Sequence, residues 1–311
     1  MYLIDKLYQS VHPFQHMNGY KSNALLGPDA LLGPVEGAVA HVFRPDSESI
    51  PGSASYNNHG ASLLFVCEHA SSYIPESLND LGLSPDARFS HIAWDIGAYD
   101  LAVALARKCN APLVASDVSR LVYDCNRPLE DASATPAVSE VFEVPGNRSL
   151  SAKQRQQRHD EIYLPFSQLV ESQIIQLSVE TTSSGGLWSQ PVLVTVHSFT
   201  PVYHGANREI DIGLLHDVDD RFATAMVDIV AGSHSEWYTA EESSPYRVDL
   251  NQPYSASDGV LHTLLTHARP QGLAHVMIEV NNKLIRDAAG VARVAHQLAT
   301  MINHTMQKGP Q

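Results

Sequence analysis

The sequence contains few cysteines, and their spacing does not suit thiolate chemistry. Only Cys67, Cys109 and Cys125 occur among the 311 residues, and no two of them form a Cys-x-x-Cys pair. A disulfide framework needs paired cysteines, and a thiolate zinc site needs closely spaced ones. Neither type of structure is therefore expected in this protein.

Basic side chains and long apolar runs are also scarce. The chain has 20 Lys and Arg against 34 Asp and Glu, which gives a net charge of −14. Nucleic-acid binding requires clustered positive charge, so a nucleic-acid partner is not expected. A membrane partner is not expected either, because no apolar run reaches the roughly 18 residues that a spanning helix needs. The first residues lack the pattern of an export signal, which favours a cytoplasmic location.

The organisation of the chain changes near residue 60. Residues 1–60 are rich in Gly, Pro, Ser and Asn, and we expect them to form an N-terminal arm that is largely irregular, with room for short local structure. From there on, strand and helix patterns alternate. Strands are predicted at 62–67, 111–116, 191–197, 210–215 and 274–280, and helices at 98–110, 151–179, 218–231 and 287–306. This alternation predicts a single catalytic α/β domain over residues 61–311, with helices on both faces of a sheet.

Three of the apolar runs finish at or next to a side chain that can bind a metal or transfer a proton. These side chains are His69, His197 and Glu279, and Asp95 lies between the first two in HIAWDIGAYD. In layered α/β folds, ligands bind at the carboxyl ends of the strands. Two imidazoles and a carboxylate form a common catalytic zinc set that leaves one position open for water. A further glutamate could take the proton of that water.

Each member of this set also has a structural interpretation. His69 and His197 could be hydrogen-bonded histidines at strand ends, and Asp95 could begin a helix as its N-cap. Glu68 is a second candidate for the carboxylate ligand. If the chain stays extended, Glu68 and His69 point to opposite faces, so both should not bind the same ion.

A second polar cluster follows in SDVSRLVYDCNRP, residues 116–128. Its arginines suit a substrate carboxylate, because the planar guanidinium offers two parallel hydrogen bonds. The alternative is a structural ion pair, for example between Asp124 and Arg120. Arg208 and Ser198 are further substrate-binding candidates. The complete set of candidate substrate-binding residues is Arg120, Asn126, Arg127, Ser198 and Arg208.

Several segments in order resemble one known family. They include CEHASSYIP, HIAWDIGA, SRLVYDCNRP, HSFTPV, REIDIGLL and GLAHVMIEVNNKLI. From about residue 62 to 305 the chain resembles the N-formylglutamate amidohydrolases. The resemblance implies a fold similar to the zinc carboxypeptidases, a three-layer architecture with a twisted, mostly parallel mixed sheet and helices on both faces. It also implies hydrolysis of the amide of an N-acyl acidic amino acid, as in the conversion of N-formyl-L-glutamate to L-glutamate and formate, with zinc or another divalent metal as cofactor.

By motif, the resemblance assigns metal binding to His69, Asp95 and His197, and catalysis to Glu279. It places Arg127 and Asn126, with Arg120 as a second cation, at the substrate. Two departures from the family pattern bear on substrate choice. Asn281, Asn282 and Lys283 stand where the family often has an arginine, a polar residue and an acid, and Ser167 stands where a histidine is common.

Two other functions remain open from sequence. One is a zinc peptidase or amidase that acts on a cell-wall peptide or another N-acyl amino acid. The other is a binding protein that has kept the pocket and lost catalysis, although the presence of Glu279 argues against it. The oligomeric state is not indicated by any pattern.

Overall fold

The computed structural model describes residues 18–19, 38–45, 63–184, 188–231 and 246–309. Their main element is an eight-stranded mixed sheet. From one edge to the other it contains β1 (Asn18–Gly19), β2 (Ala40–Phe43), β4 (Leu113–Ser116), β3 (Leu63–Cys67), β7 (Val192–Phe199), β12 (His275–Asn281), β10 (Ile212–Leu215) and β11 (Val248–Leu250). The four central strands β4, β3, β7 and β12 run parallel, whereas β2 and β10 join them antiparallel.

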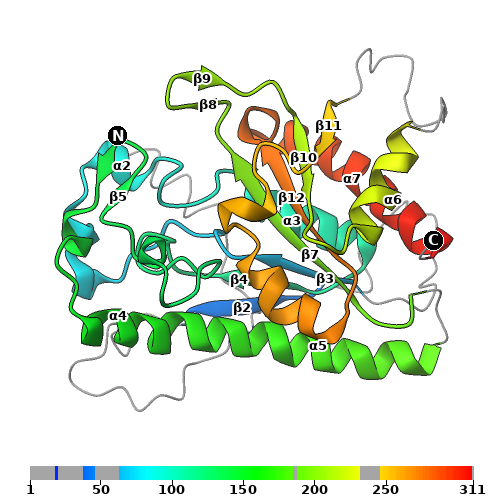
Figure 1. Ribbon diagram of the computed structural model, residues 1–311, viewed down its shortest axis with the longest axis horizontal. Coiled ribbons are helices and arrows are strands. Elements are labelled where there is room, and N and C mark those ends of the chain that lie inside the picture. Colours follow the sequence, from blue (N-terminus) through cyan, green and yellow to red (C-terminus); the bar gives the residue numbers. More distant parts are fainter. Residues whose placement is uncertain (1–17, 20–37, 46–62, 185–187, 232–245, 310–311) are drawn as a thin grey trace.

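Helices cover both faces of this sheet, which confirms the predicted three-layer α/β fold (Figure 1). One face packs against α3 (Ala98–Cys109), α6 (Arg221–Ala231) and α7 (Ala288–Lys308). The other packs against α5 (Leu164–Ser184) and the irregular segments around it. No helix within the described ranges is long and apolar enough to cross a membrane.

The central strand β3 shows why these sequences form a two-sided core. All five of its residues are buried. Leu63, Phe65 and Cys67 belong to the core under α3, α6 and α7, whereas Leu64 and Val66 belong to the core under α5. Successive side chains of a strand point to opposite faces, so a continuous apolar run is what a strand covered on both sides requires.

The long helical pattern of residues 151–179 forms one continuous helical run with a wide turn before Pro165 (Figure 1). The chain forms α4 (Ala152–Arg158), then a wide π turn over His159–Tyr163, and then α5, and the backbone stays helical on both sides of the π turn. Pro165, which has no N–H to donate, follows this turn, and a π turn is one way in which a helix accommodates a break in its hydrogen-bond ladder.

The N-terminal arm contributes one short strand to the sheet. Residues 40–43 form β2, which pairs with β4 inside the main sheet, and the expectation of a largely irregular arm left room for such local structure. Most of residues 1–60 lie outside the described residues, so the arm and the assignment of 61–311 to a single catalytic domain stay predictions. A strand as short as β2 is stabilised by its neighbour rather than by a sequence pattern of its own.

Candidate metal centre and active site

The side chains of His69, Asp95 and His197 converge in the interior of the protein. Their potential ligand atoms all lie within 4.8 Å of one another, and all three residues are buried. Asp95 Oδ2 lies 3.3 Å from His69 Nδ1 and 2.9 Å from His197 Nδ1. The structure thus brings together the three groups that the sequence indicated, of which Asp95 and His197 alone are 102 positions apart in the chain.

Each of these residues is placed by the element before it. His69 follows β3, and His197 lies within β7, the neighbouring parallel strand. Asp95 is held by its backbone N–H, which donates to the carbonyl of His69 at 3.0 Å. The helix α3 begins after Gly97, whose φ of 80° is left-handed and whose Cβ would meet the carbonyl oxygen of Ile285 at 2.5 Å. Asp95 is therefore not the N-cap of α3, and its carboxylate is directed to the histidines instead.

The outer nitrogen of each imidazole faces another buried carboxylate. His69 Nε2 lies 2.7 Å from Asp124 Oδ1, and His197 Nε2 lies 3.1 Å from Glu68 Oε2. Metal-binding histidines commonly have such an acid behind them, which orients the ring. Glu68, the alternative carboxylate ligand, thus stands behind His197 and Asp95 stands between the two rings. Sequence reasoning did not foresee either outer contact, because they join different strands and loops.

Arg120 is committed to the acids of this cluster. Its Nη1 donates to Asp95 Oδ1 at 3.2 Å and its Nη2 to Asp124 Oδ2 at 2.8 Å. The structural ion pair with Asp124 is therefore present, and the guanidinium fixes the orientation of Asp95. This geometry speaks against Arg120 as the group that grips a substrate carboxylate.

The charges around the site favour a bound divalent cation. Glu68, Asp95, Asp124 and Glu279 are all buried, and Arg120 is the cation that pairs with members of this group. Buried charges need compensation, so excess negative charge of this kind is costly on its own. Each imidazole also has an acceptor at both nitrogens, which a neutral ring with one N–H cannot satisfy. A cation bound at the two Nδ1 atoms would resolve both conflicts.

The pKa shifts of the imidazoles follow from this surplus of acids. Burial alone would lower the pKa of His197, but Glu68 and Asp95 outweigh it and hold that pKa well above its ordinary value. Burial and Arg120 lower the pKa of His69, yet Asp124 and Asp95 raise it overall. A pocket that attracts positive charge this strongly has the electrostatics of a metal site.

Glu279 stands beside this cluster with a free carboxylate oxygen. It lies on β12 directly opposite His197 on β7, and only 5% of its surface is exposed. Its Oε2 has no hydrogen-bond partner among the described residues. Burial raises its pKa to about 7, against the opposing effect of the nearby His197. A carboxylate with this pKa can exchange a proton near neutral pH.

Two of the candidate substrate-binding residues have structural contacts. The Asn126 side chain donates to the carbonyl of Val260 and accepts from the N–H of Thr263, so both ends of its amide are used. Arg127 Nη1 donates to the carbonyls of Asn126 and Gly259 at 2.9 and 2.8 Å. These contacts tie the segment after Asp124 to residues 259–263. A direct role of Asn126 at the substrate is therefore not favoured by its geometry.

Ser198 contacts Asp95 and the segment after it. Its backbone N–H donates to Asp95 Oδ2 at 3.3 Å, and its hydroxyl donates to the carbonyl of Ile96 at 2.8 Å. It thus holds Asp95 from the side of β7.

Arg208 differs from the other arginines of the candidate set. Its guanidinium lies over three aromatic rings, 5.5 Å from the centroid of Phe199, 4.4 Å from Tyr203 and 4.8 Å from Tyr254. Like Arg127, it takes part in no ion pair within the described part of the chain, and its Nη1 donates one long hydrogen bond to the carbonyl of Thr200 at 3.4 Å. Tyr254, a residue that the sequence did not single out, has its pKa raised to about 12 by burial and by the nearby Glu279. Arg208 and Tyr254 therefore stand next to the site, with the positive charge of Arg208 uncompensated.

Both departures from the family pattern have local contacts. Lys283 Nζ pairs with Asp211 at 3.1 Å, and the Asn281 side chain donates to the carbonyl of Ile210. Ser167 lies 3.2 Å from Nε2 of His267. These residues contact the elements around the site and do not contribute atoms to the metal cluster.

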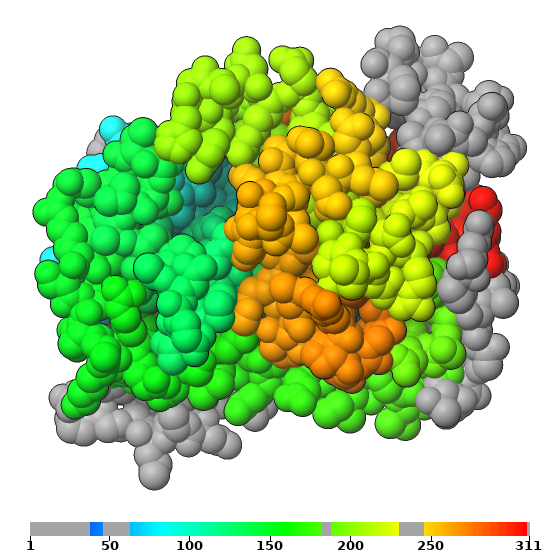
Figure 2. Space-filling view, in the orientation of Figure 1, coloured from blue at the N-terminus to red at the C-terminus, as the bar shows by residue number. Residues whose placement is uncertain are grey.

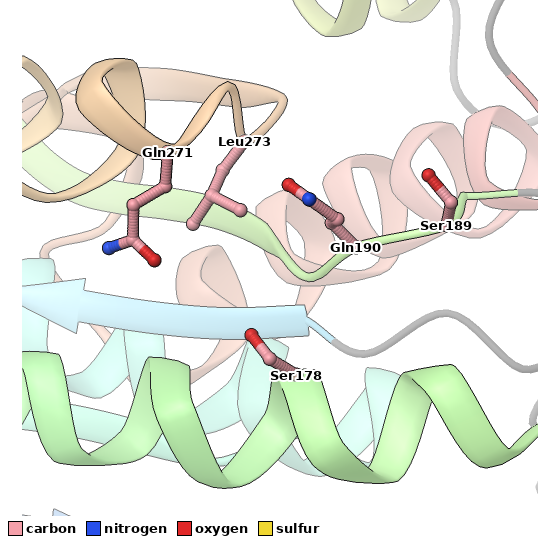
Figure 3. A pocket seen from close by; sticks show the side chains of 5 residues that line it. All are labelled: Ser178, Ser189, Gln190, Gln271 and Leu273. Atoms are coloured by element: carbon pink, nitrogen blue, oxygen red, sulfur yellow. The ribbon is translucent and has the colours of Figure 1, made fainter.

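The molecular surface is hollowed beside the hairpin that follows β7 (Figure 2). Figure 2 shows the hollow between the hairpin of β8 (Val202–Tyr203) and β9 (Ala206–Asn207) and the green segment around residues 120–145, with teal atoms from the region of α3 at its floor. A separate small cavity of about 150 Å³ is lined by Ser178, Ser189, Gln190, Gln271 and Leu273 (Figure 3). It lies near the start of β7, at the opposite end of the sheet, and includes none of the candidate residues.

Comparisons with known proteins concern the family and the fold. The model of the N-formylglutamate amidohydrolase family matches residues 61–286. A solved structure of a gene product from Agrobacterium tumefaciens is 39% identical, with a TM-score of 0.74, over 89% of this chain and 98% of that chain. The structure of N-formylglutamate amidohydrolase from Ralstonia eutropha JMP134 is 16% identical, with a TM-score of 0.53, over 86% of this chain and 97% of that one, and shares the fold. A search of curated proteins gives no match.

Proposed function

Since this chain belongs to the N-formylglutamate amidohydrolase family, we propose that it hydrolyses N-formyl-L-glutamate to L-glutamate and formate. The family supports the coarser statement, a hydrolase that acts on the amide of a small molecule. The observation that carries the proposed chemistry is the free, buried carboxylate of Glu279 beside the cluster of His69, Asp95 and His197. This is the arrangement that metal-assisted hydrolysis of an amide requires.

The proposed cofactor is zinc or another divalent metal. Nδ1 of His69, Nδ1 of His197 and a carboxylate oxygen of Asp95 would hold it, and these donors are those of common catalytic zinc sites. A divalent ion bound there supplies Lewis acidity, which polarises the acyl oxygen and lowers the pKa of a water toward about 7. Asp124 and Glu68 keep the two rings oriented, and Arg120 and Ser198 keep Asp95 in place.

Glu279 performs the proton transfers in this proposal. Its carboxylate takes a proton from the attacking water, whose oxygen forms a bond to the formyl carbon. When the carbon–nitrogen bond breaks, Glu279 returns that proton to the nitrogen, so that glutamate leaves as a free amine and formate remains. The raised pKa of Glu279, about 7, suits a group that must both accept and release a proton.

Arg208 is the arginine best suited to bind a carboxylate of the substrate. Arg120 is occupied by two acids, and Arg127 by backbone carbonyls and Ser133. Arg208 instead has its guanidinium held by aromatic rings and has no acidic partner among the described residues. Such a preorganised, uncompensated guanidinium favours substrates that carry an acidic group near the reacting amide.

The test is formate release by the zinc-loaded protein from a panel of N-acyl amino acids. N-Formylglutamate should be the best substrate, N-formylleucine should be poor because it lacks the second carboxylate, and N-acetylglutamate tests the acyl group. Preference for a longer acyl group or a peptide would instead support a peptidase or amidase. A protein that binds metal but turns over no member of the panel would refute the hydrolase and favour a binding protein.

A further inference from the structure

Glu68 is a fully buried carboxylate that no step of the proposed reaction uses. Its exposed fraction is 0%. It directly follows β3 and directly precedes His69, one of the proposed ligands. A buried carboxylate is costly unless something compensates it, so its surroundings should show what it does.

The surroundings of Glu68 point to His197. Glu68 Oε2 lies 3.1 Å from His197 Nε2, close enough for an ion pair, although neither carboxylate oxygen of Glu68 nor Nε2 of His197 makes a hydrogen bond of regular geometry within the described residues. On the other side of the same ring, Nδ1 lies 2.9 Å from Asp95 Oδ2. The ring of His197 is therefore held between two carboxylates, one at each nitrogen.

The backbone explains how one short segment serves both histidines. Because β3 and β7 are parallel neighbours, the end of β3 lies beside His197. Glu68 and His69 lie in a turn directly after β3, in which His69 contributes its own ring while Glu68 contacts the ring of His197. The segment Glu68–His69 thus supplies one imidazole of the cluster and the carboxylate that contacts the other imidazole.

We infer that Glu68 is a positioning residue, which keeps the proton of His197 on Nε2 and turns Nδ1 toward Asp95 to receive the metal. The inference rests on the metal site of the proposed function. Asp124 stands behind His69 in the same way, but it also pairs with Arg120 and accepts from the N–H of Asn126, so its substitution would disturb several contacts at once. Glu68 allows the cleaner experiment.

The experiment measures the affinity of the purified protein for Zn²⁺ by competition with a chromophoric chelator. Loss of an acid behind a metal-binding histidine typically weakens metal binding by roughly 10–100-fold, and we expect this for Glu68→Leu. Glu68→Gln keeps an acceptor for the Nε2 proton, so its affinity should lie between those of wild type and Glu68→Leu. Glu279→Gln removes a buried negative charge from the same cluster without touching Nε2, so its loss of zinc affinity should be smaller than that of Glu68→Leu.

Three results would overturn the inference. A zinc affinity of Glu68→Leu equal to that of wild type would show that His197 does not need Glu68 to position its ring for the metal. Equal losses in Glu68→Leu, Glu68→Gln and Glu279→Gln would show that only charge matters. Metal-free Glu68→Leu and Glu68→Gln that both fail to fold would assign Glu68 to the fold instead, because loss of one partner of a buried ion pair is strongly destabilising.

Failure of this inference can be told apart from failure of the proposed function. A wild-type protein that binds zinc and releases formate, alongside a Glu68→Leu variant with the same zinc affinity, would defeat the inference alone. A wild-type protein that binds no divalent metal would defeat both.

Discussion

The substitution Glu279→Gln separates metal binding from catalysis. The amide has nearly the shape of the carboxylate but cannot accept the proton of a water. Because Glu279 holds its Oε2 free of hydrogen bonds and is not among the three proposed ligands, the variant should fold and bind zinc as wild type does. Only the proton transfer should be lost.

The size of the loss follows from the role. A positioned general acid–base contributes roughly 10²–10⁴-fold to the rate, so kcat should fall by that factor. The structure also sets the pH dependence. Burial raises the pKa of Glu279 to about 7, and only the deprotonated form can act as base, so kcat/KM of wild type should rise with pH and level off above this value. A divalent cation nearby favours the charged carboxylate and would move the midpoint below 7.

The assay is formate release between pH 5 and 9 with zinc in excess, together with metal analysis of both proteins. The kcat/KM of wild type should fall about tenfold for each pH unit below the midpoint. The residual activity of Glu279→Gln should not show this fall at acidic pH. A variant within tenfold of wild type, or one with the same acidic limb, would refute the role of Glu279 as the base.

Three further predictions concern the metal, the substrate and the fold. His197→Ala should purify without stoichiometric zinc and without activity, as metal analysis and the formate assay can show; retention of zinc would exclude this ligand set. Arg208→Ala should raise KM for N-formylglutamate by roughly 10–100-fold with little change in kcat. The control Arg247→Ala, at an exposed arginine that pairs with Asp249, should leave KM unchanged. Equal KM values for Arg208→Ala and wild type would exclude Arg208 as a substrate-binding residue. Gly97→Ala should lower the free energy of unfolding, measured by denaturant titration, by at least about 2 kcal/mol, because both the left-handed φ of Gly97 and the backbone oxygen near its Cβ position oppose a side chain. Gly205→Ala should lower it by only about 1 kcal/mol, because Gly205 also has a positive φ but open space around its Cβ position. Similar losses at the two glycines would contradict the steric argument.

The comparison of sequence and structure at the site has a simple pattern. His69, His197 and Glu279 were found because each follows or ends a run of apolar residues, and parallel strands bring their carboxyl ends to one edge of the sheet. Asp95 was found through a motif, and the structure explains that motif by the left-handed turn at Gly97. The family resemblance of the sequence was confirmed by the match over residues 61–286.

The outer contacts of the site were beyond any local pattern. Glu68 could be weighed as a ligand from sequence, but its place behind His197 depends on the pairing of two strands. Arg120 looked equally suited to a substrate and to an ion pair until its two bonds to acids were seen. Asn126 looked like a substrate group, and its amide is instead used by residues 260–263, which are more than 130 positions away.

The amino-acid sequence by itself determined the α/β class, the central strands, the family and the residues that can carry the chemistry, because each of these depends on local periodicity and residue type. Only the tertiary structure decided which carboxylate lies between the imidazoles, which ones stand behind them, and which arginine keeps its charge available. Those choices are made by contacts between segments far apart in the chain, where burial and charge compensation, rather than local preference, select the partners.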